Sequence, residues 1–169
     1  GDVKITGSTK RSLVKGDLTI GSEKERAGSV TIQNNSTSSL DPVLNGAVKI
    51  YAEKDVSISG NTTSSVIGGA CTIDTTGDVT LKNTTGRVCG STATINTTGD
   101  VKIIGDTGAH YNLINGALTI GSPNVPAKSV EITNAFTPND GDHYSSYVVN
   151  GSATIYATGD VKITGRSSN

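Results

Sequence analysis

Aromatic and sulfur-containing residues are scarce in this chain. Tryptophan and methionine are absent, and aromatic residues make up 4% of the 169 positions. Apolar residues reach only 33%, which is thin for the core of an ordinary globular domain. Such a composition would also fit a disordered chain. Disorder is excluded because the apolar residues alternate strictly with polar ones, as in Val3–Ile5, Val30–Ile32 and Val56–Ile58, and a disordered tract has no reason to keep that period.

Charge and long apolar runs are scarce too. The formal net charge is −1 and there is no basic run, so nucleic acid, whose binding needs a positive field, is not an expected partner. No segment approaches about 18 consecutive apolar residues, so we predict no membrane insertion. No signal peptide is recognisable. The chain begins at Gly1 inside a repeat, and we therefore expect a mature or trimmed fragment, for which a missing signal says nothing about export.

One unit is written twice between residues 69 and 105. Ala70–Ile73 corresponds to Thr92–Ile95, and Asp78–Leu81 corresponds to Asp100–Ile103, which in both copies follows a Thr-Thr-Gly turn. The offset between the copies is 22 residues. A fixed period of this size is typical of one coil of a parallel β-solenoid.

Three short segments recur in the same order along the whole chain and are predicted to be strands. The first recurs at residues 18–20, 48–50, 71–73, 93–95, 118–120 and 153–155. The second recurs at residues 3–5, 30–32, 56–58, 79–81, 101–103, 130–132 and 161–163. The third is shorter and recurs at residues 13–14, 43–44, 66–67, 88–89, 113–114 and 148–149. Their alternation directs one face of each strand inward, and stacked coils then align equivalent residues about 4.8 Å apart.

The sequence therefore predicts an all-β fold, a right-handed single-stranded parallel β-helix, or solenoid, of about six coils. Each coil has three short strands and 21–35 residues. The right-handed winding is expected from the chirality of parallel crossovers. We predict a single domain over residues 1–169. Its coils are 16–45, 46–68, 69–90, 91–115 and 116–150, with partial coils at 1–15 and 151–169.

A longer repeat overlies the coils. Residues 1–35 match residues 99–134, and both copies carry a four-residue insertion, at Glu23–Arg26 and Pro123–Pro126. Residues 159–165 begin the motif a third time. Solenoid ends need polar caps, and none is recognisable, so we predict that the chain is a segment of a longer array. Uncapped ends are open sheet edges that tend to pair, so end-to-end self-association of the fragment is expected.

Two turns are longer than the others, at residues 106–112 and 133–147. They carry both histidines of the chain together with tyrosines and aspartates. The candidate ligand-binding residues are His110, Tyr111, Asp140, Asp142, His143, Tyr144 and Tyr147. Aromatic rings stack on sugars or peptides while carboxylates accept hydroxyl bonds, so these turns are the expected place for a binding site. The alternative is that the same side chains only pack the turns onto the solenoid.

An aspartate opens the second segment in most coils, at Asp55, Asp78, Asp100 and Asp160, and also at Asp2. Stacked carboxylates could bind Ca²⁺, but the calcium-binding nonapeptide repeat is absent. Aspartate after glycine typically forms Asx-type bonds to backbone N–H groups in turns. We interpret the column as a structural turn ladder and predict no metal site and no cofactor.

The two cysteines, Cys71 and Cys89, both occupy inward columns of one coil. A disulfide between them would have to cross a corner of the coil with a Cα separation of about 4.4–6.8 Å. The alternative is that both are small buried apolar residues. A zinc site is not expected from two thiols without a nearby histidine.

The repeated GDVxIxG units, with Asn-Gly and Thr-Thr-Gly corners, resemble bacterial surface β-solenoids, namely adhesin-type proteins with GDV-rich repeats and the passenger regions of exported adhesins. The resemblance covers nearly the whole chain. It implies export, an extracellular location at the cell surface, and a non-enzymatic role as a stalk or cell-adhesion module. Host or cell-wall glycans, or host surface proteins, are the partners that it implies. A carbohydrate-binding module with its site on the two long turns is the alternative.

Polysaccharide lyases and hydrolases of the pectin-lyase type share this fold, but fold alone does not carry function. Those enzymes resemble one another in an acidic cluster beside a basic residue on a strand face. Here the strand lysines Lys4, Lys102 and Lys162 recur with the repeat, as do the aspartates. No coil stands out with an acidic pair and an arginine, so an enzyme is not predicted.

Overall fold

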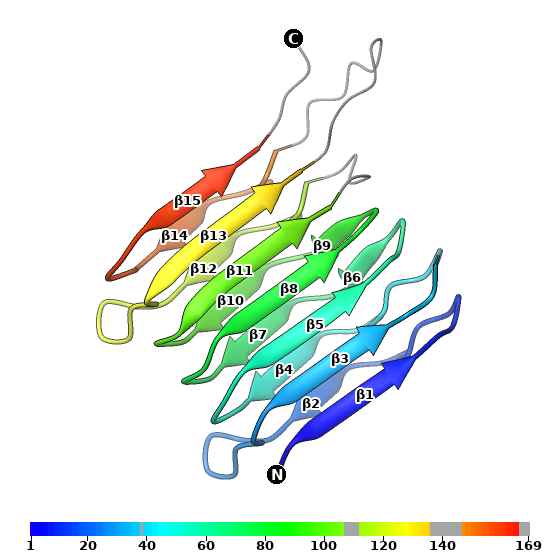
Figure 1. Ribbon diagram of the computed structural model, residues 1–169, viewed down its shortest axis with the longest axis horizontal. Coiled ribbons are helices and arrows are strands. Elements are labelled where there is room, and N and C mark those ends of the chain that lie inside the picture. The colour runs from blue at the N-terminus through cyan, green and yellow to red at the C-terminus, as the bar shows by residue number, and fades with distance from the viewer. Residues whose placement is uncertain (38, 107–111, 136–146, 166–169) are drawn as a thin grey trace, which may run out of the picture.

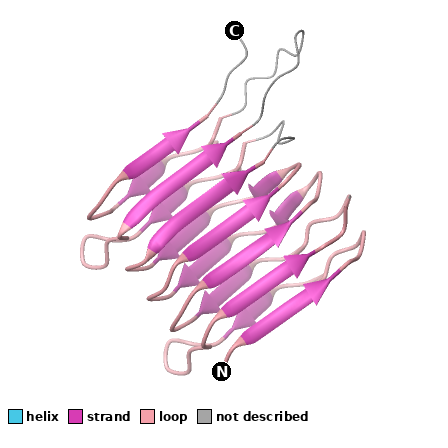
Figure 2. Ribbon diagram, in the orientation of Figure 1, coloured by secondary structure: helices cyan, strands magenta, loops and turns pink. Residues whose placement is uncertain are grey.

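The computed structural model describes residues 1–37, 39–106, 112–135 and 147–165. These residues form fifteen short strands joined by turns, with no helix among them (Figures 1 and 2). The strands stack as a parallel β-solenoid. The prediction of an all-β parallel β-helix is confirmed.

The larger sheet is built from the second segment of every coil. Its strands, in spatial order, are β1 (Val3–Gly7), β3 (Val30–Asn34), β5 (Val56–Gly60), β8 (Val79–Asn83), β11 (Asp100–Gly105), β13 (Ser129–Asn134) and β15 (Val161–Thr164). All neighbours are parallel and keep the register that the repeat implies, so that Val79 lies between Val56 and Val101. The alternation of valine and isoleucine in the sequence thus becomes two continuous inward columns.

The smaller sheet is built from the first segment. Its strands are β2 (Leu18–Ile20), β4 (Val48–Tyr51), β7 (Cys71–Asp74), β10 (Ala93–Asn96), β12 (Leu118–Ile120) and β14 (Ala153–Ile155). The chain completes about five turns, because the first and last coils are partial. In Figure 1 the seven strands of the larger sheet lie in front and run to the upper right, while the six strands of the smaller sheet lie behind and run back. The stack rises from the N-terminus to the C-terminus, so the chain winds in a right-handed sense.

The third side of the solenoid is less regular than the other two. Within the described ranges, a ladder forms there only between β6 (Ser65–Ile67) and β9 (Arg87–Cys89). In the other coils the third segment makes single bridges between equivalent residues, for example Val14 to Leu44 and Ile114 to Val149. The third segment supplies only two apolar residues, usually followed by an Asn-Gly or Gly-Gly corner. It is therefore too short for a full strand in most coils.

The core is the stack of inward aliphatics. Val30, Ile32 and their equivalents in the central coils are almost completely buried, and burial of each such side chain contributes roughly 1.5–3 kcal/mol. The last described coil is different, because Val161 is 48% exposed and Ile163 is 50% exposed. An apolar edge therefore remains open at that end of the described stack.

One inward column alternates glycine with asparagine in every described coil. Its members are Gly7, Asn34, Gly60, Asn83, Gly105, Asn134 and Gly165. The buried Asn83 side chain reaches back to the preceding coil, donating to the Thr62 carbonyl at 3.1 Å and accepting the Thr62 N–H at 3.1 Å. Asn34 makes the same pair of bonds with Thr9, at 2.9 and 3.2 Å.

The glycines of this column stand where a side chain would not fit. A Cβ atom at Gly60 would lie 2.5 Å from Cγ2 of Val43, and one at Gly105 would lie 2.2 Å from Cδ2 of Leu113. An asparagine in one coil therefore holds the turn that follows the glycine of the coil before it. The structural period of this column is two coils.

We expect Asn83→Ala to lower the free energy of unfolding by about 2–3 kcal/mol, because it leaves the buried N–H and carbonyl of Thr62 without partners. The Arg87 carbonyl, which accepts from the same amide at 2.6 Å, loses a bond as well. Chemical denaturation measures the change. The control is Asn115→Ala, which removes an exposed amide and should change stability by less than about 0.5 kcal/mol. Equal effects of the two variants would contradict the role assigned to the buried column.

Candidate functional site

The predicted ligand site falls mostly on residues that the structure does not describe. His110, Tyr111, Asp140, Asp142, His143 and Tyr144 lie outside the described residues. Tyr147 is described and is 65% exposed. Its backbone N–H donates to Oδ1 of Asn112 at 2.8 Å.

The bases of the two long turns lie side by side. They leave the solenoid after β11 and β13, which are paired neighbours. The N–H of Ala135 donates to the Gly105 carbonyl at 2.9 Å, and the bond from Tyr147 to Asn112 joins the turns again where they return. Turns predicted from the sequence to lie on adjacent coils are thus held together at both ends.

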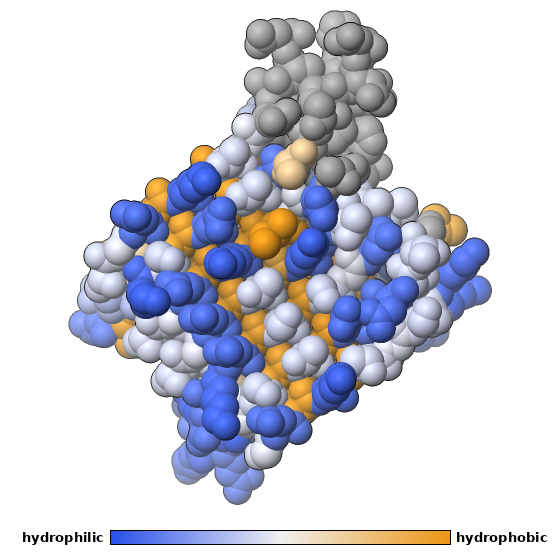
Figure 3. All heavy atoms as spheres, in the orientation of Figure 1, coloured by the Kyte–Doolittle hydropathy of each residue, from blue (hydrophilic) through white to orange (hydrophobic). Residues whose placement is uncertain are grey.

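The aspartate column ties successive coils to each other. Oδ1 of Asp55 accepts the N–H of Asp78 at 2.9 Å, and Oδ1 of Asp78 accepts the N–H of Asp100 at 2.8 Å. Asp2 accepts the N–H of Ser29 at 2.7 Å in the same way. The sequence suggested bonds within one turn, whereas these bonds run to the next coil. Figure 3 shows hydrophilic residues gathered along the side on which these strands begin.

Asp160 ends the column on the last described coil, where its side chain is exposed. Among the described residues, no group of three or more His, Cys, Asp or Glu side chains is arranged to hold a metal ion. The carboxylates of Asp2, Asp55, Asp78 and Asp100 each accept a backbone or side-chain donor. In this part of the chain their chemistry is hydrogen bonding between coils.

Hydrogen bonds hold the pKa of two of these carboxyl groups below its ordinary value. The Ser29 backbone N–H lowers the pKa of Asp2. The pKa of Asp100 is lowered first by the Ser129 hydroxyl, at 2.7 Å, and then by the Lys128 ammonium, at 3.0 Å. A carboxyl group whose pKa is lowered on folding stabilises the fold above its unfolded pKa and loses that contribution as the pH falls through the folded pKa.

We expect NMR titration to give Asp100 a carboxyl pKa below 3.8, and Ser129→Ala to raise it, because the variant removes the strongest donor. The stability difference between the wild type and Asp100→Asn should be complete above pH 3.8 and should shrink below it. A wild-type pKa at or above 3.8 would contradict the assignment of these bonds.

The two cysteines are free thiols, and both are buried. Burial raises the pKa of Cys71 well above its ordinary value, and burial also raises the pKa of Cys89. The Cys89 thiol lies 3.4 Å from the carbonyl oxygens of Gly69 and Ser91. Of the two alternatives left by the sequence, the described structure has buried thiols that serve as small apolar residues.

A thiol reagent should react with neither cysteine in the folded protein at pH 8, since the thiolate is the reactive form and both pKa values are raised. In denaturant without reductant, both thiols should react. Colorimetric thiol counting measures both states. If no thiol reacts after unfolding until a reductant is added, the cysteines are joined by a disulfide and the assignment is wrong.

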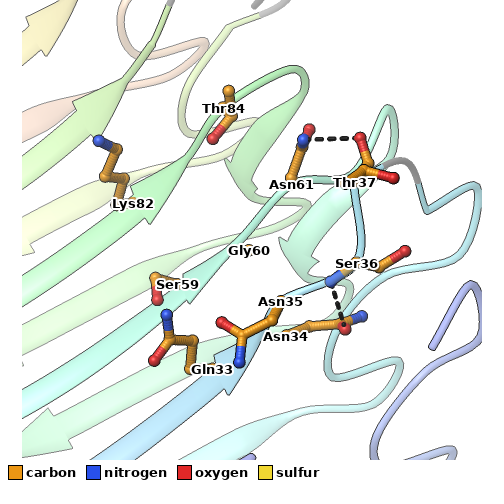
Figure 4. A pocket seen from close by; sticks show the side chains of 10 residues that line it. All are labelled: Gln33, Asn34, Asn35, Ser36, Thr37, Ser59, Gly60, Asn61, Lys82 and Thr84. Carbon is orange, nitrogen blue, oxygen red and sulfur yellow. Dashed lines mark hydrogen bonds between the residues drawn. The ribbon is translucent and has the colours of Figure 1, made fainter. Parts of the chain in front are cut away.

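A polar hollow of about 370 Å³ lies over the C-terminal ends of β3, β5 and β8 (Figure 4). Its lining residues are Gln33, Asn34, Asn35, Ser36, Thr37, Ser59, Gly60, Asn61, Lys82 and Thr84. Gln33, Ser59 and Lys82 come from the outer faces of three successive strands. Asn34 and Gly60 end β3 and β5. The remaining residues follow on the turns, where Asn61 donates to the Thr37 carbonyl at 2.8 Å.

The lining of the polar hollow offers amides, hydroxyls and one ammonium, and it contains no carboxylate, histidine or thiol. Lys82 also pairs with Asp106 at 3.1 Å. The hollow can form hydrogen bonds with a polar ligand but has no pair of groups for acid–base or nucleophilic chemistry. Sequence reasoning missed it. The available signal was the alignment of Gln33, Ser59 and Lys82 at one outward position of three consecutive coils.

No helix among the described residues is long and apolar enough to span a bilayer. Comparisons of the chain with protein-family models, with curated proteins and with solved structures give no match.

Proposed function

We propose that this chain is a non-enzymatic, extracellular structural segment of a bacterial surface protein, which acts as a stalk or as a cell-adhesion module. The observation that carries the proposal is the continuous bonding between coils. Each strand of both main sheets is hydrogen-bonded to its equivalent in the next coil, and the aspartate and asparagine columns add side-chain bonds between coils. Such a stack extends along one axis, because each coil contacts only its neighbours.

The geometry also suits a spacer. There are six steps between the seven strands of the larger sheet, and at about 4.8 Å per step the described stack is roughly 29 Å long. A longer array of the same coils extends in proportion to its number of coils. Adhesins and stalks need this property, because they must present a surface at a distance from the cell.

Beads coated with the protein test the adhesive role directly. They should attach to host cells, or to immobilised host surface proteins and glycans, more strongly than beads coated with an unrelated β-solenoid. Attachment no greater than that of the control beads would leave only the stalk.

The open apolar edge of the last described coil supports end-to-end pairing of the fragment. Val161 and Ile163 are exposed, and no strand of the described residues pairs with the outer edge of β15. Such an edge can pair with a strand of another chain. We expect light scattering to show a mass that rises with protein concentration. Val161→Lys should reduce the rise, because a charge on an edge strand disfavours pairing. A monomer at all concentrations would contradict this part of the proposal.

A carbohydrate-binding module is the second candidate, and the joined bases of the two long turns favour it. The bond between Tyr147 and Asn112 joins the last residue of the turn at 133–147 to the last residue of the turn at 106–112. An aromatic residue exposed there is suited to stacking on a sugar ring.

A glycan array distinguishes the two candidates. The wild type is compared with a variant in which Tyr111, Tyr144 and Tyr147 are all changed to alanine. Binding that disappears in the variant supports a sugar site on the long turns, whereas no binding by either protein supports the stalk. Turnover of a polysaccharide by the wild type would instead favour an enzyme of the lyase or hydrolase class.

A further inference from the structure

A second hollow, of about 410 Å³, lies on the outer face of the smaller sheet. It is formed where the insertion after β2 folds beside the end of β4. Its lining residues are Thr19, Gly21, Ser22, Glu23, Lys24, Lys49 and Tyr51. Binding sites for small molecules commonly have volumes of about 300–1,000 Å³ and combine an apolar surface with a few polar groups.

The insertion that forms one wall is fixed in place. Gly21 has a φ of 70°, which favours glycine, and a Cβ there would lie 2.5 Å from the Tyr51 carbonyl oxygen. The N–H of Ser22 donates to the Glu25 carbonyl at 2.8 Å, and the Ser22 hydroxyl accepts the N–H of Glu25 at 3.0 Å. The wall is therefore organised before any ligand arrives, and binding need not order it.

Arg26 clamps this insertion to the two coils that follow. Its Nη1 donates to Oδ1 of Asp74 at 2.7 Å and to the Ala52 carbonyl at 3.2 Å. The guanidinium lies 5.9 Å from the centre of the Tyr51 ring. Tyr51, 8% exposed, is thus held between the insertion and Asp74. The Arg26 charge is balanced by Asp74 and is not left for a ligand.

Two other cations face the hollow. Nζ of Lys49 lies 5.1 Å from the centre of the Tyr51 ring, and both Lys49 and Lys24 are exposed. Glu23 supplies the one carboxylate of the lining. The hollow thus combines the small exposed part of a tyrosine, two hydroxyls and an excess of one positive charge.

The chain contains a natural comparison for this hollow. The insertion after β12 repeats the same turn: Gly121 has a φ of 67°, and the N–H of Ser122 donates to the Val125 carbonyl at 2.9 Å. Tyr156 takes the place of Tyr51 there, since Gly121 approaches its carbonyl oxygen in the same way. Figure 1 shows both insertions projecting from one corner of the solenoid. They are four coils, or roughly 19 Å, apart.

The charges are present in only one of the two insertions. At the second, Asn124 stands in place of Lys24, and Thr154 stands in place of Lys49. The turn geometry is therefore common to both copies and needs no lysine. The lysines of the first copy are therefore not required to build the turn; Lys24 is exposed, and Lys49 contacts the Tyr51 ring while its side chain remains exposed to solvent.

We propose that the hollow lined by Tyr51, Lys24 and Lys49 binds a saccharide unit that carries a carboxylate, such as a uronic acid. The sugar contacts the small exposed part of Tyr51, the two ammonium groups receive the carboxylate, and the hydroxyls of Thr19 and Ser22 bond to the sugar hydroxyls. The inference rests on the adhesive role proposed above, because it takes the ligand to be an acidic saccharide of a cell surface. The site is separate from the long turns.

NMR titration of the ¹⁵N-labelled protein with a tetrasaccharide of alternating glucuronic acid and N-acetylglucosamine tests the site. Chemical shifts should change at Gly21, Ser22 and Lys24, and affinity should fall as salt is added. The double variant Lys24→Asn, Lys49→Thr copies the second insertion, so it should fold normally and bind about fivefold more weakly. Tyr51→Ala should weaken binding about tenfold, whereas Tyr156→Ala, the matched control, should leave it unchanged.

Several results would overturn the site. One is an unchanged affinity in the double variant, and another is a set of shift changes confined to residues away from the insertion. If an uncharged N-acetylglucosamine tetramer binds as tightly as the acidic tetrasaccharide, the carboxylate has no role in binding. If sodium sulfate at the same concentration of charge displaces the acidic tetrasaccharide, the hollow is a simple anion site. If the tetrasaccharide does not bind in the NMR titration but the coated beads still adhere, only this site is overturned. If the beads do not adhere but the tetrasaccharide binds in the NMR titration, only the adhesive role is overturned.

Discussion

Hydrogen bonding between equivalent backbone groups of successive coils is the interaction on which this structure depends. A single coil supplies only a few aliphatic side chains and cannot enclose a core. Once its strands pair in register with those of the next coil, each valine or isoleucine lies on its equivalent, and water is excluded from the interior. The polar composition of the chain is then sufficient, because the core grows by one thin layer per coil.

The inward columns, the parallel register and the boundaries of most strands could be predicted from the sequence, because the Val-x-Ile pattern fixes which side chains face inward. The role of Asp78 was less accessible. Aspartate after glycine has a strong local signature, but its partner is the N–H of Asp100, 22 residues away. The same holds for the glycine–asparagine column, whose logic depends on contacts between Asn83 and Thr62 of the preceding coil. Bonds between coils leave no mark in a short window of sequence.

The candidate sites also differ in how far the sequence predicts them. The long turns were identified by their histidines and tyrosines, and the structure joins their bases through Tyr147 and Asn112. The two hollows escaped sequence reasoning because their lining residues come from several coils and look like ordinary solvent-facing positions. Only the three-dimensional neighbourhood distinguishes Lys49, which lies over an aromatic ring, from Lys102 on the solvent-exposed face of β11.

The two-coil period of the glycine–asparagine column has an evolutionary consequence. Loss or duplication of a single coil would place two glycines or two asparagines next to each other in the column. Two adjacent glycines would leave a turn without its asparagine hydrogen bonds, and two adjacent asparagines would leave one side chain without room. Recombination within such a gene should therefore be tolerated only when it adds or removes coils in pairs. The chain is consistent with this rule: the motif shared by residues 1–7, 99–105 and 159–165 recurs at the first, fifth and seventh strands of the larger sheet, always in a glycine coil. The repeating unit on which recombination acts is therefore a pair of coils, one with glycine and one with asparagine in this column.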